Sequence, residues 1–128
     1  MQNAINWFEI PVADLTRATA FYADVLRIEL RAERFQDTMM AIFPYAAANL
    51  GVGGALVHDA RKRPAPTGAV VYLNAGTDIR GAVARAAKGG GQVTMPVTDI
   101  GVPGFIALIQ DTEGNVVGLH EPRPPQPA

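Results

Sequence analysis

The sequence predicts an α+β fold made of two consecutive βαβββ modules, and three observations support this prediction. The chain has 128 residues and a mass of 13.6 kDa, which suits one domain. A strand-like stretch, an aspartate and an amphipathic helical stretch occur in this order twice, with Asp14 and Asp78 lying 64 residues apart. Three strand-like stretches follow each helical stretch. We expect a single domain over residues 1–122, with modules at about 3–58 and 68–122.

The first module begins with a strand over residues 5–12, which are rich in Ile, Trp, Phe and Val. Asp14 suits a helix N-cap. From Leu15 to Leu26 apolar residues recur at intervals of three and four, which predicts a helix with one apolar face. The stretches 28–36, 38–45 and 52–58 favour strands, with a turn over residues 46–51 before the last of them.

The second module repeats this order. Residues 69–74 form an apolar strand-like stretch, and Asp78 suits a second N-cap. Apolar residues from Ile79 to Ala87 follow helical spacing, and Lys88 with the glycines behind it suits a helix C-terminus. Strands are expected over 92–97, 104–110 and 115–121. On the 64-residue offset, Phe8 corresponds to Tyr72 and Leu15 to Ile79.

Composition excludes several classes of site and partner. The chain has no cysteine and no serine, so disulfides, zinc–thiolate sites and a Ser-His-Asp triad are impossible. The net charge of −1 gives no reason to expect nucleic acid or an anionic membrane surface as a partner. No signal peptide or long apolar segment is visible, and we expect a cytoplasmic protein.

Two polar segments lie outside the predicted modules. Residues 59–68 form a connection that contains the basic run Arg61-Lys62-Arg63. We interpret this run as a solvated surface linker, the alternative being a phosphate-binding patch. The proline-rich residues 123–128 predict a flexible tail.

Two sequence motifs carry a resemblance to a known family. Asn-Trp-Phe-Glu-Ile-Pro-Val-Ala-Asp-Leu leads into Ala-Phe-Tyr-Ala-Asp-Val-Leu, and Asp111-Thr-Glu-Gly-Asn115 precedes the closing apolar strand. Together with the two modules they resemble the vicinal oxygen chelate superfamily, the glyoxalase / bleomycin-resistance / extradiol-dioxygenase group, over roughly residues 3–122. The resemblance implies that each module curls its mixed sheet into half of a barrel around a ligand pocket. It also implies a homodimer.

The resemblance further implies where a metal would be bound. Metal-using members hold one divalent ion through His and Glu side chains on the first and last strands of the two modules. The matching positions here are Trp7, a residue within Gly53-Gly54-Ala55, Ala69 or Val71, and Gly118. None of these side chains donates a lone pair to a metal. We therefore expect neither a bound metal nor another cofactor.

Strand alternation indicates two ionisable residues, Glu9 and His120, as candidate site residues. Side chains two positions apart in a strand share a face, so Glu9 faces the same way as residue 7 and His120 the same way as Gly118. If both faces line the pocket, a carboxylate and an imidazole could act as a general acid–base pair. In the alternative, His120 lies at the solvated end of its strand and Glu9 pairs with Arg31 or Arg34. The sequence leaves both possibilities open.

Apolar and aromatic residues indicate what the pocket binds. Residues that suit its wall are Trp7, Met39 or Met40, Phe43, Met95 and Ile106, with space left by Gly118; in the alternative they belong to the core. We predict a bleomycin-resistance-like protein that binds an apolar or aromatic small molecule without metal, through Trp7, Glu9, Met95, Ile106 and Gly118. The second hypothesis is a glyoxalase-like lyase or isomerase, or a dioxygenase-related enzyme, that uses Glu9 and His120 or an atypical metal site.

Overall fold

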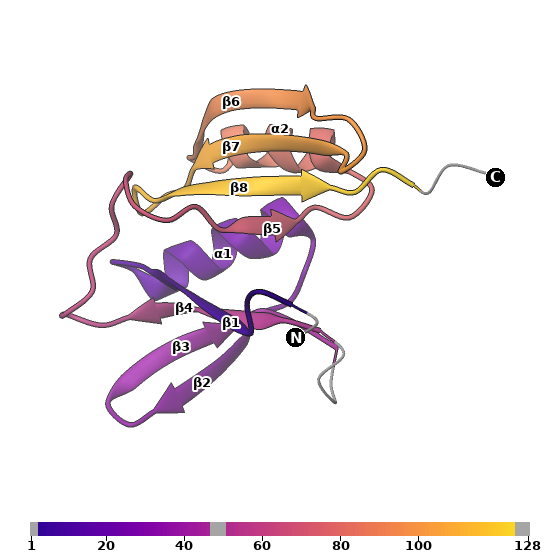
Figure 1. Cartoon of the computed structure of the whole chain (residues 1–128). Helices are drawn as coiled ribbons and strands as arrows, with labels where there is room; N and C mark the ends of the chain where they lie inside the picture. The colour runs from indigo at the N-terminus through magenta and orange to yellow at the C-terminus, as the bar shows by residue number, and fades with distance from the viewer. Residues whose placement is uncertain (1–2, 47–50, 125–128) are drawn as a thin grey trace.

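The computed structural model describes residues 3–46 and 51–124, which form two four-stranded mixed sheets with one helix each (Figure 1). The first sheet has the order β1-β4-β3-β2 and contains β1 (Trp7–Pro11), β2 (Arg31–Phe35), β3 (Thr38–Ile42) and β4 (Gly53–His58). The second has the order β5-β8-β7-β6 and contains β5 (Tyr72–Asn74), β6 (Gln92–Asp99), β7 (Phe105–Gln110) and β8 (Val116–Glu121). The helices are α1 (Leu15–Leu26) and α2 (Ile79–Lys88). The predicted α+β fold of two βαβββ modules is confirmed.

Both helices begin at the aspartates that the sequence indicates. The side chain of Asp14 accepts a hydrogen bond from the backbone N–H of Arg17 at 3.0 Å, and that of Asp78 accepts one from Gly81 at 3.1 Å. Each bond satisfies one of the N–H groups that the first turn of a helix leaves unpaired. These caps set the start of each helix, and α1 covers the predicted residues 15–26.

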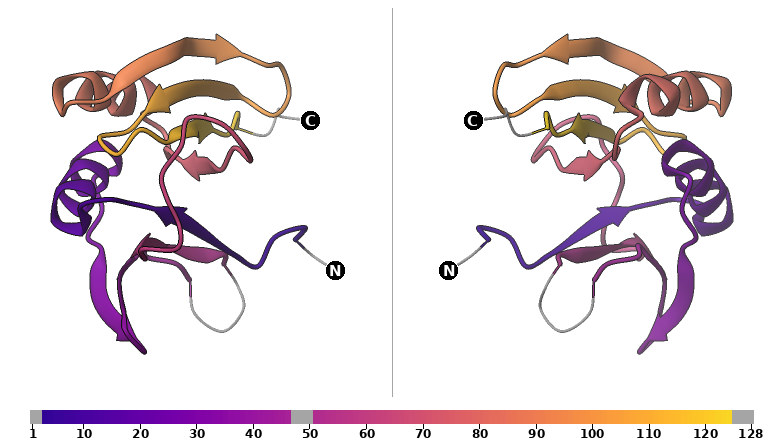
Figure 2. Two further views of the ribbon diagram at one scale, coloured as in Figure 1. Left: turned by 90° about the vertical axis from the view of Figure 1, so that its left-hand side faces the viewer. Right: turned by 90° about the vertical axis from the view of Figure 1, so that its right-hand side faces the viewer.

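The two modules share one hydrophobic core, which lies between the sheets and the helices. Helices α1 and α2 pack against each other on the same side of the molecule (Figure 2). Side chains from both modules are fully buried there, among them Tyr22, Leu56, Ile109 and Leu119. The guanidinium of Arg85 on α2 also donates two hydrogen bonds, of 3.1 and 2.9 Å, to the carbonyl of Val25 on α1. This shared core holds the two sheets in a fixed arrangement.

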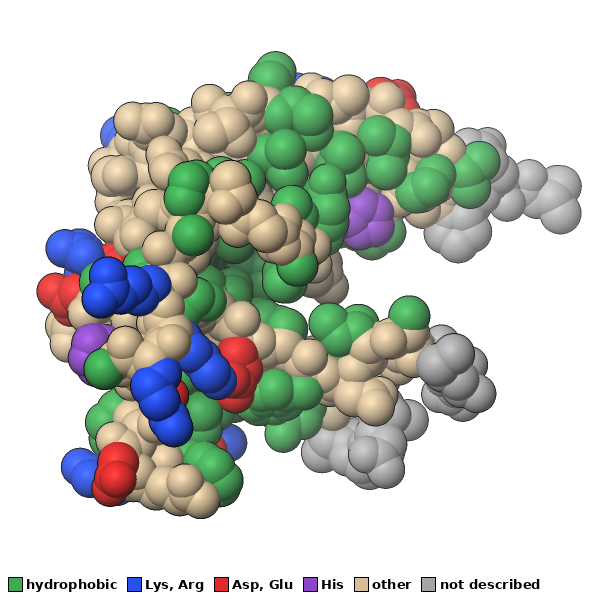
Figure 3. Space-filling model, turned by 60° about the vertical axis from the view of Figure 1, so that its left-hand side comes forward, with side chains coloured by type: hydrophobic (Ala, Val, Ile, Leu, Met, Phe, Trp, Pro, Cys, Tyr) green, Lys and Arg blue, Asp and Glu red, His purple; other side chains and the backbone are tan. Residues whose placement is uncertain are grey.

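Strand alternation divides each sheet into a helix-facing side and an outer side. In β1 and β4 the core residues Ile10 and Leu56 pair with each other, and in β5 and β8 the core residues Leu73 and Leu119 do the same. The residues between them face away from the helices. These two outer sides border a hollow between the halves of the molecule, which we call the inter-sheet hollow (Figure 3).

Strand register corrects the correspondence between the modules. Trp7 pairs with Gly53 in the parallel ladder of β1 and β4, and Tyr72 pairs with Gly118 in that of β5 and β8. Trp7 therefore corresponds to Tyr72, and the expected match of Phe8 with Tyr72 is wrong. The reason is that the chain runs seven residues from Trp7 to the first N-cap but only six from Tyr72 to the second. The helices keep the 64-residue offset and the first strands do not.

Parts of two predicted segments lie outside the described residues: 47–50 of the expected turn and 125–128 of the expected tail. Within the described part, Arg123 donates a hydrogen bond to Asp99 at 2.6 Å, and its guanidinium lies 4.7 Å from the centre of the Phe105 ring. These contacts hold the chain against β6 and β7 just after β8. No helix in the described ranges is long and apolar enough to cross a membrane.

Candidate functional site

Three large aromatic side chains are partly exposed on the outer sides of the two sheets. Trp7 is 40% exposed, Tyr45 is 50% exposed and Tyr72 is 48% exposed. The rings of Trp7 and Tyr45 meet edge to face, with centroids 6.0 Å apart. Figure 3 shows hydrophobic side chains above and below the inter-sheet hollow. The hollow therefore offers aromatic and apolar surface to solvent.

Glycines in the last strand of each module seat these aromatic rings. A Cβ built on Gly53 would overlap the ring of Tyr45, and a Cβ built on Gly118 would overlap the ring of Tyr72. The expectation that Gly118 leaves space for a ligand is therefore corrected, because the tyrosine ring takes that space. The ring itself forms the surface that a ligand would meet.

The second sheet contributes the apolar residues that the sequence indicates for the wall. Met95 pairs with Leu108, which pairs with Gly118, so these residues share the outer side of the sheet, and Ile106 lies on the same side next to His120. The side chains of Met95 and Ile106 are half-buried. They extend the aromatic surface along β6 and β7.

The structure also shows where the residues of the first module lie that were predicted for the pocket wall. Phe43 is 5% exposed and packs against Phe8 and Tyr22, with ring centroids 5.3 and 5.8 Å apart, so it belongs to the core and not to a cavity. Of the two methionines, Met40 packs beside Ile42 on the outer side, whereas Met39 has the opposite orientation.

Glu9 and His120 each have a partner of their own. The carboxylate of Glu9 accepts a hydrogen bond from Lys62 at 3.2 Å and a long one of 3.4 Å from the Trp7 indole. The carboxylate thus pairs with the linker, and Arg31 pairs instead with Glu33. His120 Nε2 lies 2.7 Å from the carbonyl oxygen of Pro103. Because a carbonyl only accepts, Nε2 donates, which leaves Nδ1 of the neutral ring as an acceptor.

The turn between β7 and β8 joins the second module to the start of α1. Glu113, whose side chain has 0% exposure, accepts hydrogen bonds from the backbone of Ala13 at 2.9 Å and Asp14 at 2.8 Å. It also accepts one from Arg17 Nε at 2.7 Å. Burial acts to raise the pKa of Glu113, but the hydrogen bonds from Arg17, Asp14 and their neighbours outweigh it and lower the pKa to about 2.

The same turn contributes two buried polar side chains. Asp111 accepts a hydrogen bond of 2.6 Å from the Tyr22 hydroxyl, and burial, with the nearby Asp111 charge, raises the pKa of Tyr22 well above its usual value. Asn115 donates to the carbonyl of Pro11 at 2.7 Å and accepts from the backbone of Ala65 at 3.1 Å. The Asp-Thr-Glu-Gly-Asn motif therefore connects the modules and the linker.

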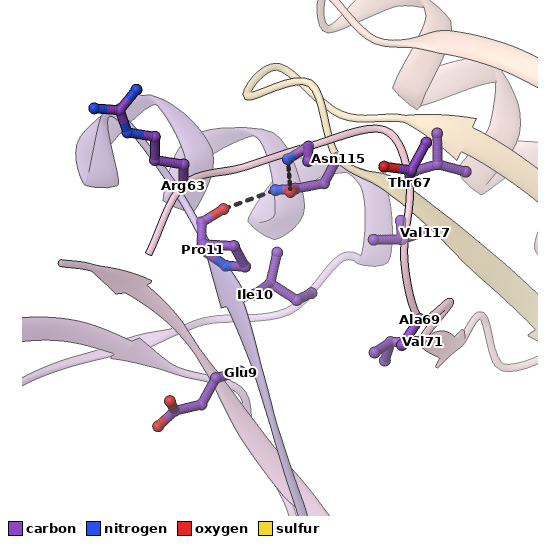
Figure 4. A pocket seen from close by; sticks show the side chains of 11 residues that line it. Glu9, Ile10, Pro11, Arg63, Thr67, Ala69, Val71, Asn115 and Val117 are labelled. Carbon is purple, nitrogen blue, oxygen red and sulfur yellow. Dashed lines mark hydrogen bonds between the residues drawn. The ribbon is translucent and has the colours of Figure 1, made fainter. Parts of the chain in front are cut away.

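A pocket of about 130 Å³ lies where β1, the linker and β8 meet, and we call it the seam pocket. Figure 4 shows Ile10, Val71 and Val117 pointing toward its centre, with the polar ends of Glu9 and Arg63 directed outward. Its lining residues are Glu9, Ile10, Pro11, Arg63, Ala65, Thr67, Ala69, Val71, Asn115, Val116 and Val117. Sequence reasoning missed this pocket because its wall combines three segments that are distant in the chain.

The donor set of the described residues does not fit the metal site that the resemblance implies. The register places Tyr72, and not Ala69 or Val71, opposite Gly118, so the four positions are Trp7, Gly53, Tyr72 and Gly118. A single phenol is the only oxygen donor among these side chains. In the described ranges no group of three or more His, Asp or Glu residues is placed to hold an ion.

Comparisons with known proteins agree with this architecture. The model of the family described as Glyoxalase/Bleomycin resistance protein/Dioxygenase superfamily matches residues 4–119. A glyoxylase/bleomycin resistance protein/dioxygenase domain from Frankia sp. EAN1pec is 18% identical, with a TM-score of 0.70 over 98% of this chain and 96% of that chain. A fosfomycin resistance protein from Listeria monocytogenes is 14% identical, with a TM-score of 0.68 over 96% of this chain and 93% of that chain.

A larger protein is also similar in fold. A glyoxalase I mutant from Zea mays is 20% identical, with a TM-score of 0.68 over 91% of this chain and 45% of that chain. The chain thus spans about half the length of the maize protein. At these identities the likenesses show the fold alone. A search of curated proteins finds no match.

Proposed function

The chain belongs to the Glyoxalase/Bleomycin resistance protein/Dioxygenase superfamily, and on this premise we propose that it binds an apolar or aromatic small molecule in the inter-sheet hollow without a metal ion. The main support is the pair Trp7 and Tyr72, which occupy corresponding positions in the two modules and are 40% and 48% exposed. Large apolar surface held open to water favours a ligand that covers it. Met95 and Ile106 extend this surface, and Glu9 supplies a carboxylate beside Trp7.

The metal-free part of the proposal follows from donor chemistry. A divalent ion needs several nitrogen or oxygen ligands from the protein. The corresponding positions hold an indole, a phenol and two glycines. A ligand held through stacking and burial does not need metal-ligating nitrogen or oxygen atoms at these positions. Stoichiometric metal in protein purified without chelator would contradict this part.

The second candidate is an enzyme that uses Glu9 and His120, and one observation favours it. The hydrogen bond to Pro103 leaves Nδ1 of His120 available as a proton acceptor on the outer side of β8. Against it, Glu9 already pairs with Lys62 at 3.2 Å. Turnover that is lost in His120→Gln and falls with protonation of the imidazole would favour the enzyme over the binding protein.

We also propose that the protein forms a homodimer. Each sheet has two edge strands among the described residues, β1 and β2 in the first and β5 and β6 in the second, and the five residues of β2 are all exposed. Unpaired edges are normally covered or protected. A second chain would cover such an edge, as the family resemblance implies. Light scattering that gives a monomer at micromolar concentration would contradict the proposal.

Tryptophan fluorescence tests the binding site directly, because Trp7 is the only tryptophan. We expect members of a panel of aromatic compounds to quench or shift its emission, with or without a chelator. Tyr72→Ala should weaken those ligands, whereas Val102→Ala should not, since Val102 is 90% exposed at the β6–β7 loop. Glu9→Gln should weaken ligands that donate to the carboxylate by about 1–3 kcal/mol. If no compound changes the fluorescence emission of Trp7, the proposal is refuted.

A further inference from the structure

We propose that the ligand carries a carboxylate or a similar small anionic group, which Arg63 binds at the seam pocket. This inference rests on the proposed function, since it concerns the chemistry of the ligand in the same site. It changes the interpretation of the basic run in the linker, because the three cations of that run have different surroundings in the structure.

Hydrogen bonds fix the linker to both modules around the seam pocket. Lys62 donates to Glu9 on β1 at 3.2 Å, and the backbone of Ala65 donates to Asn115 at the start of β8 at 3.1 Å. Asn115 also donates to the Pro11 carbonyl at 2.7 Å and is 6% exposed. Arg63 lies between Lys62 and Ala65, so its backbone is held at the rim of the pocket although its side chain is exposed.

The charges of the linker leave one cation for a ligand. Arg61 pairs with Asp59 at 3.2 Å, and Lys62 pairs with Glu9 at the same distance. Arg63 has no ion-pair or hydrogen-bond partner among the residues that the structure describes, and it lines the seam pocket. With Glu9 balanced by Lys62, Arg63 gives the pocket a net positive charge. An anion suits this rim better than a cation does.

The remaining polar groups of the wall support the same choice. Both functions of the Asn115 amide are used within the protein, by Ala65, Pro11 and Asp111. The hydroxyl of Thr67 makes no hydrogen bond with the described part of the chain and lines the pocket. A guanidinium only donates and a hydroxyl can donate, so each of these groups accommodates an acceptor such as a carboxylate oxygen.

The size and position of the pocket define which part of the ligand it takes. Its volume of about 130 Å³ is well below the roughly 300 Å³ at which complete small-molecule sites begin. It therefore suits only a small group of a larger molecule. Glu9 lines the pocket and also touches the Trp7 indole, so the pocket and the aromatic surface adjoin. An aromatic body on Trp7 and Tyr72 with a short anionic arm fits both.

A matched pair of probes tests the inference: naphthylacetate and its neutral amide, naphthylacetamide, titrated by calorimetry into the full chain at low salt. We expect the carboxylate to bind about fivefold to tenfold more tightly than the amide, as for a partly exposed charged hydrogen bond. Arg63→Gln should abolish this preference without changing the affinity for the amide. The matched control is Arg61→Gln, which removes the same charge from the same linker at a residue paired with Asp59 and should keep the preference.

The outcomes separate the two proposals. Equal affinity for both probes in the unmodified protein would overturn the proposal that the ligand carries an anionic group. The proposal of aromatic binding would remain. A preference that persists in Arg63→Gln would overturn the role of Arg63. Failure of both probes to bind would overturn the proposed function for this class of ligand, and the inference with it. Salt should weaken the binding of naphthylacetate alone.

Discussion

The first strands of the two modules are alike where they face the helices and different where they face the inter-sheet hollow. On the helix side, Phe8 of β1 corresponds to Leu73 of β5, and both pack in the core. On the outer side, Trp7 and Glu9 of the first module correspond to Tyr72 and Asn74 of the second, and Ala55 corresponds to His120. Burial against a helix restricts a strand to apolar residues of suitable size. A face that borders solvent or a ligand is free of that restriction, so it is where the modules have diverged.

The modules also differ in the connection before the last strand. In the second module this turn contains Asp111, Glu113 and Asn115, which hydrogen-bond to residues of the first module. On the 65-residue offset of the strands, the corresponding residues of the first module are Ala46, Ala48 and Leu50, which have no polar side chain. Among the described residues, the hydrogen bonds that these turns make between the modules come from the second module, and this asymmetry leads to the following predictions.

Asp111→Ala should have the largest effect. It leaves the buried Tyr22 hydroxyl without the partner that now lies 2.6 Å away, and loss of one member of a buried charged network costs about 3 kcal/mol of unfolding free energy. Tyr22→Phe removes the hydroxyl together with its need for a partner and should cost about 1 kcal/mol. Urea unfolding of both variants measures the difference. Equal losses would show that the buried carboxylate and the hydroxyl contribute only through their mutual hydrogen bond.

Glu113→Gln should cost about 2 kcal/mol at neutral pH, because it removes a carboxylate that accepts from a guanidinium and two backbone N–H groups. The folded-state pKa of about 2 lies below the usual value of 4.5. The ionised carboxylate therefore stabilises the folded state above pH 4.5, and this contribution is lost as the pH falls toward 2. Unfolding free energies measured from pH 7 downward should show the two proteins converging. A constant difference across this range would contradict the lowered pKa.

Glycine substitutions compare the two sides of the sheets. An added Cβ at Gly54 would overlap the ring of Phe8, which packs against Phe43 in the core, and Gly54→Ala should cost about 2 kcal/mol. At Gly118 the overlap is with Tyr72, which is 48% exposed and can turn outward. Gly118→Ala should therefore cost about 1 kcal/mol and weaken aromatic ligands as well. A larger loss of stability for Gly118→Ala would mean that the Tyr72 ring is held as firmly as a core residue.

The smallest effect is expected at the outer edge of the first sheet. Arg31 lies on β2 and pairs with Glu33 at 3.4 Å, and both side chains are largely exposed. Such pairs contribute little, so Arg31→Ala should change the free energy of unfolding by less than about 0.5 kcal/mol. A clear change in oligomeric state in this variant, measured by light scattering, would place the dimer contact on β2.

Local sequence signals predicted the helices better than the strands. The helix bounds follow from the Asp14 and Asp78 caps and from apolar spacing, which are local properties. The second strand of the second module was expected over 92–97 and extends to Asp99, past Pro96. Irregular pairing of β6 with β7 accommodates this proline, since the register shifts between Met95 and Thr98. Pairing partners of this kind cannot be seen in a single segment.

The candidate site was predicted only in part, for a similar reason. Alternation predicted that Glu9 shares a face with Trp7 and His120 with Gly118, and the strand register agrees. Tyr45 and Tyr72 were missed, although glycines at Gly53 and Gly118 in last strands, with an aromatic residue nearby in each module, were a usable signal. The partner of Glu9 was sought among the arginines of the second strand, whereas Lys62 of the linker supplies it. The linker reaches Glu9 only because both modules dock on a common core.

The hydrogen bonds of Glu113 have a consequence for the order in which the chain folds. Two backbone N–H groups at the start of α1 are satisfied by a side chain about 100 positions later in the chain. During synthesis from the N-terminus, the first helix therefore emerges long before the carboxylate that binds the backbone of its N-cap residue. The first half of the protein must remain incompletely stabilised until the final hairpin closes. The two modules are similar in topology, yet this contact makes the stability of the first depend on the folding of the second.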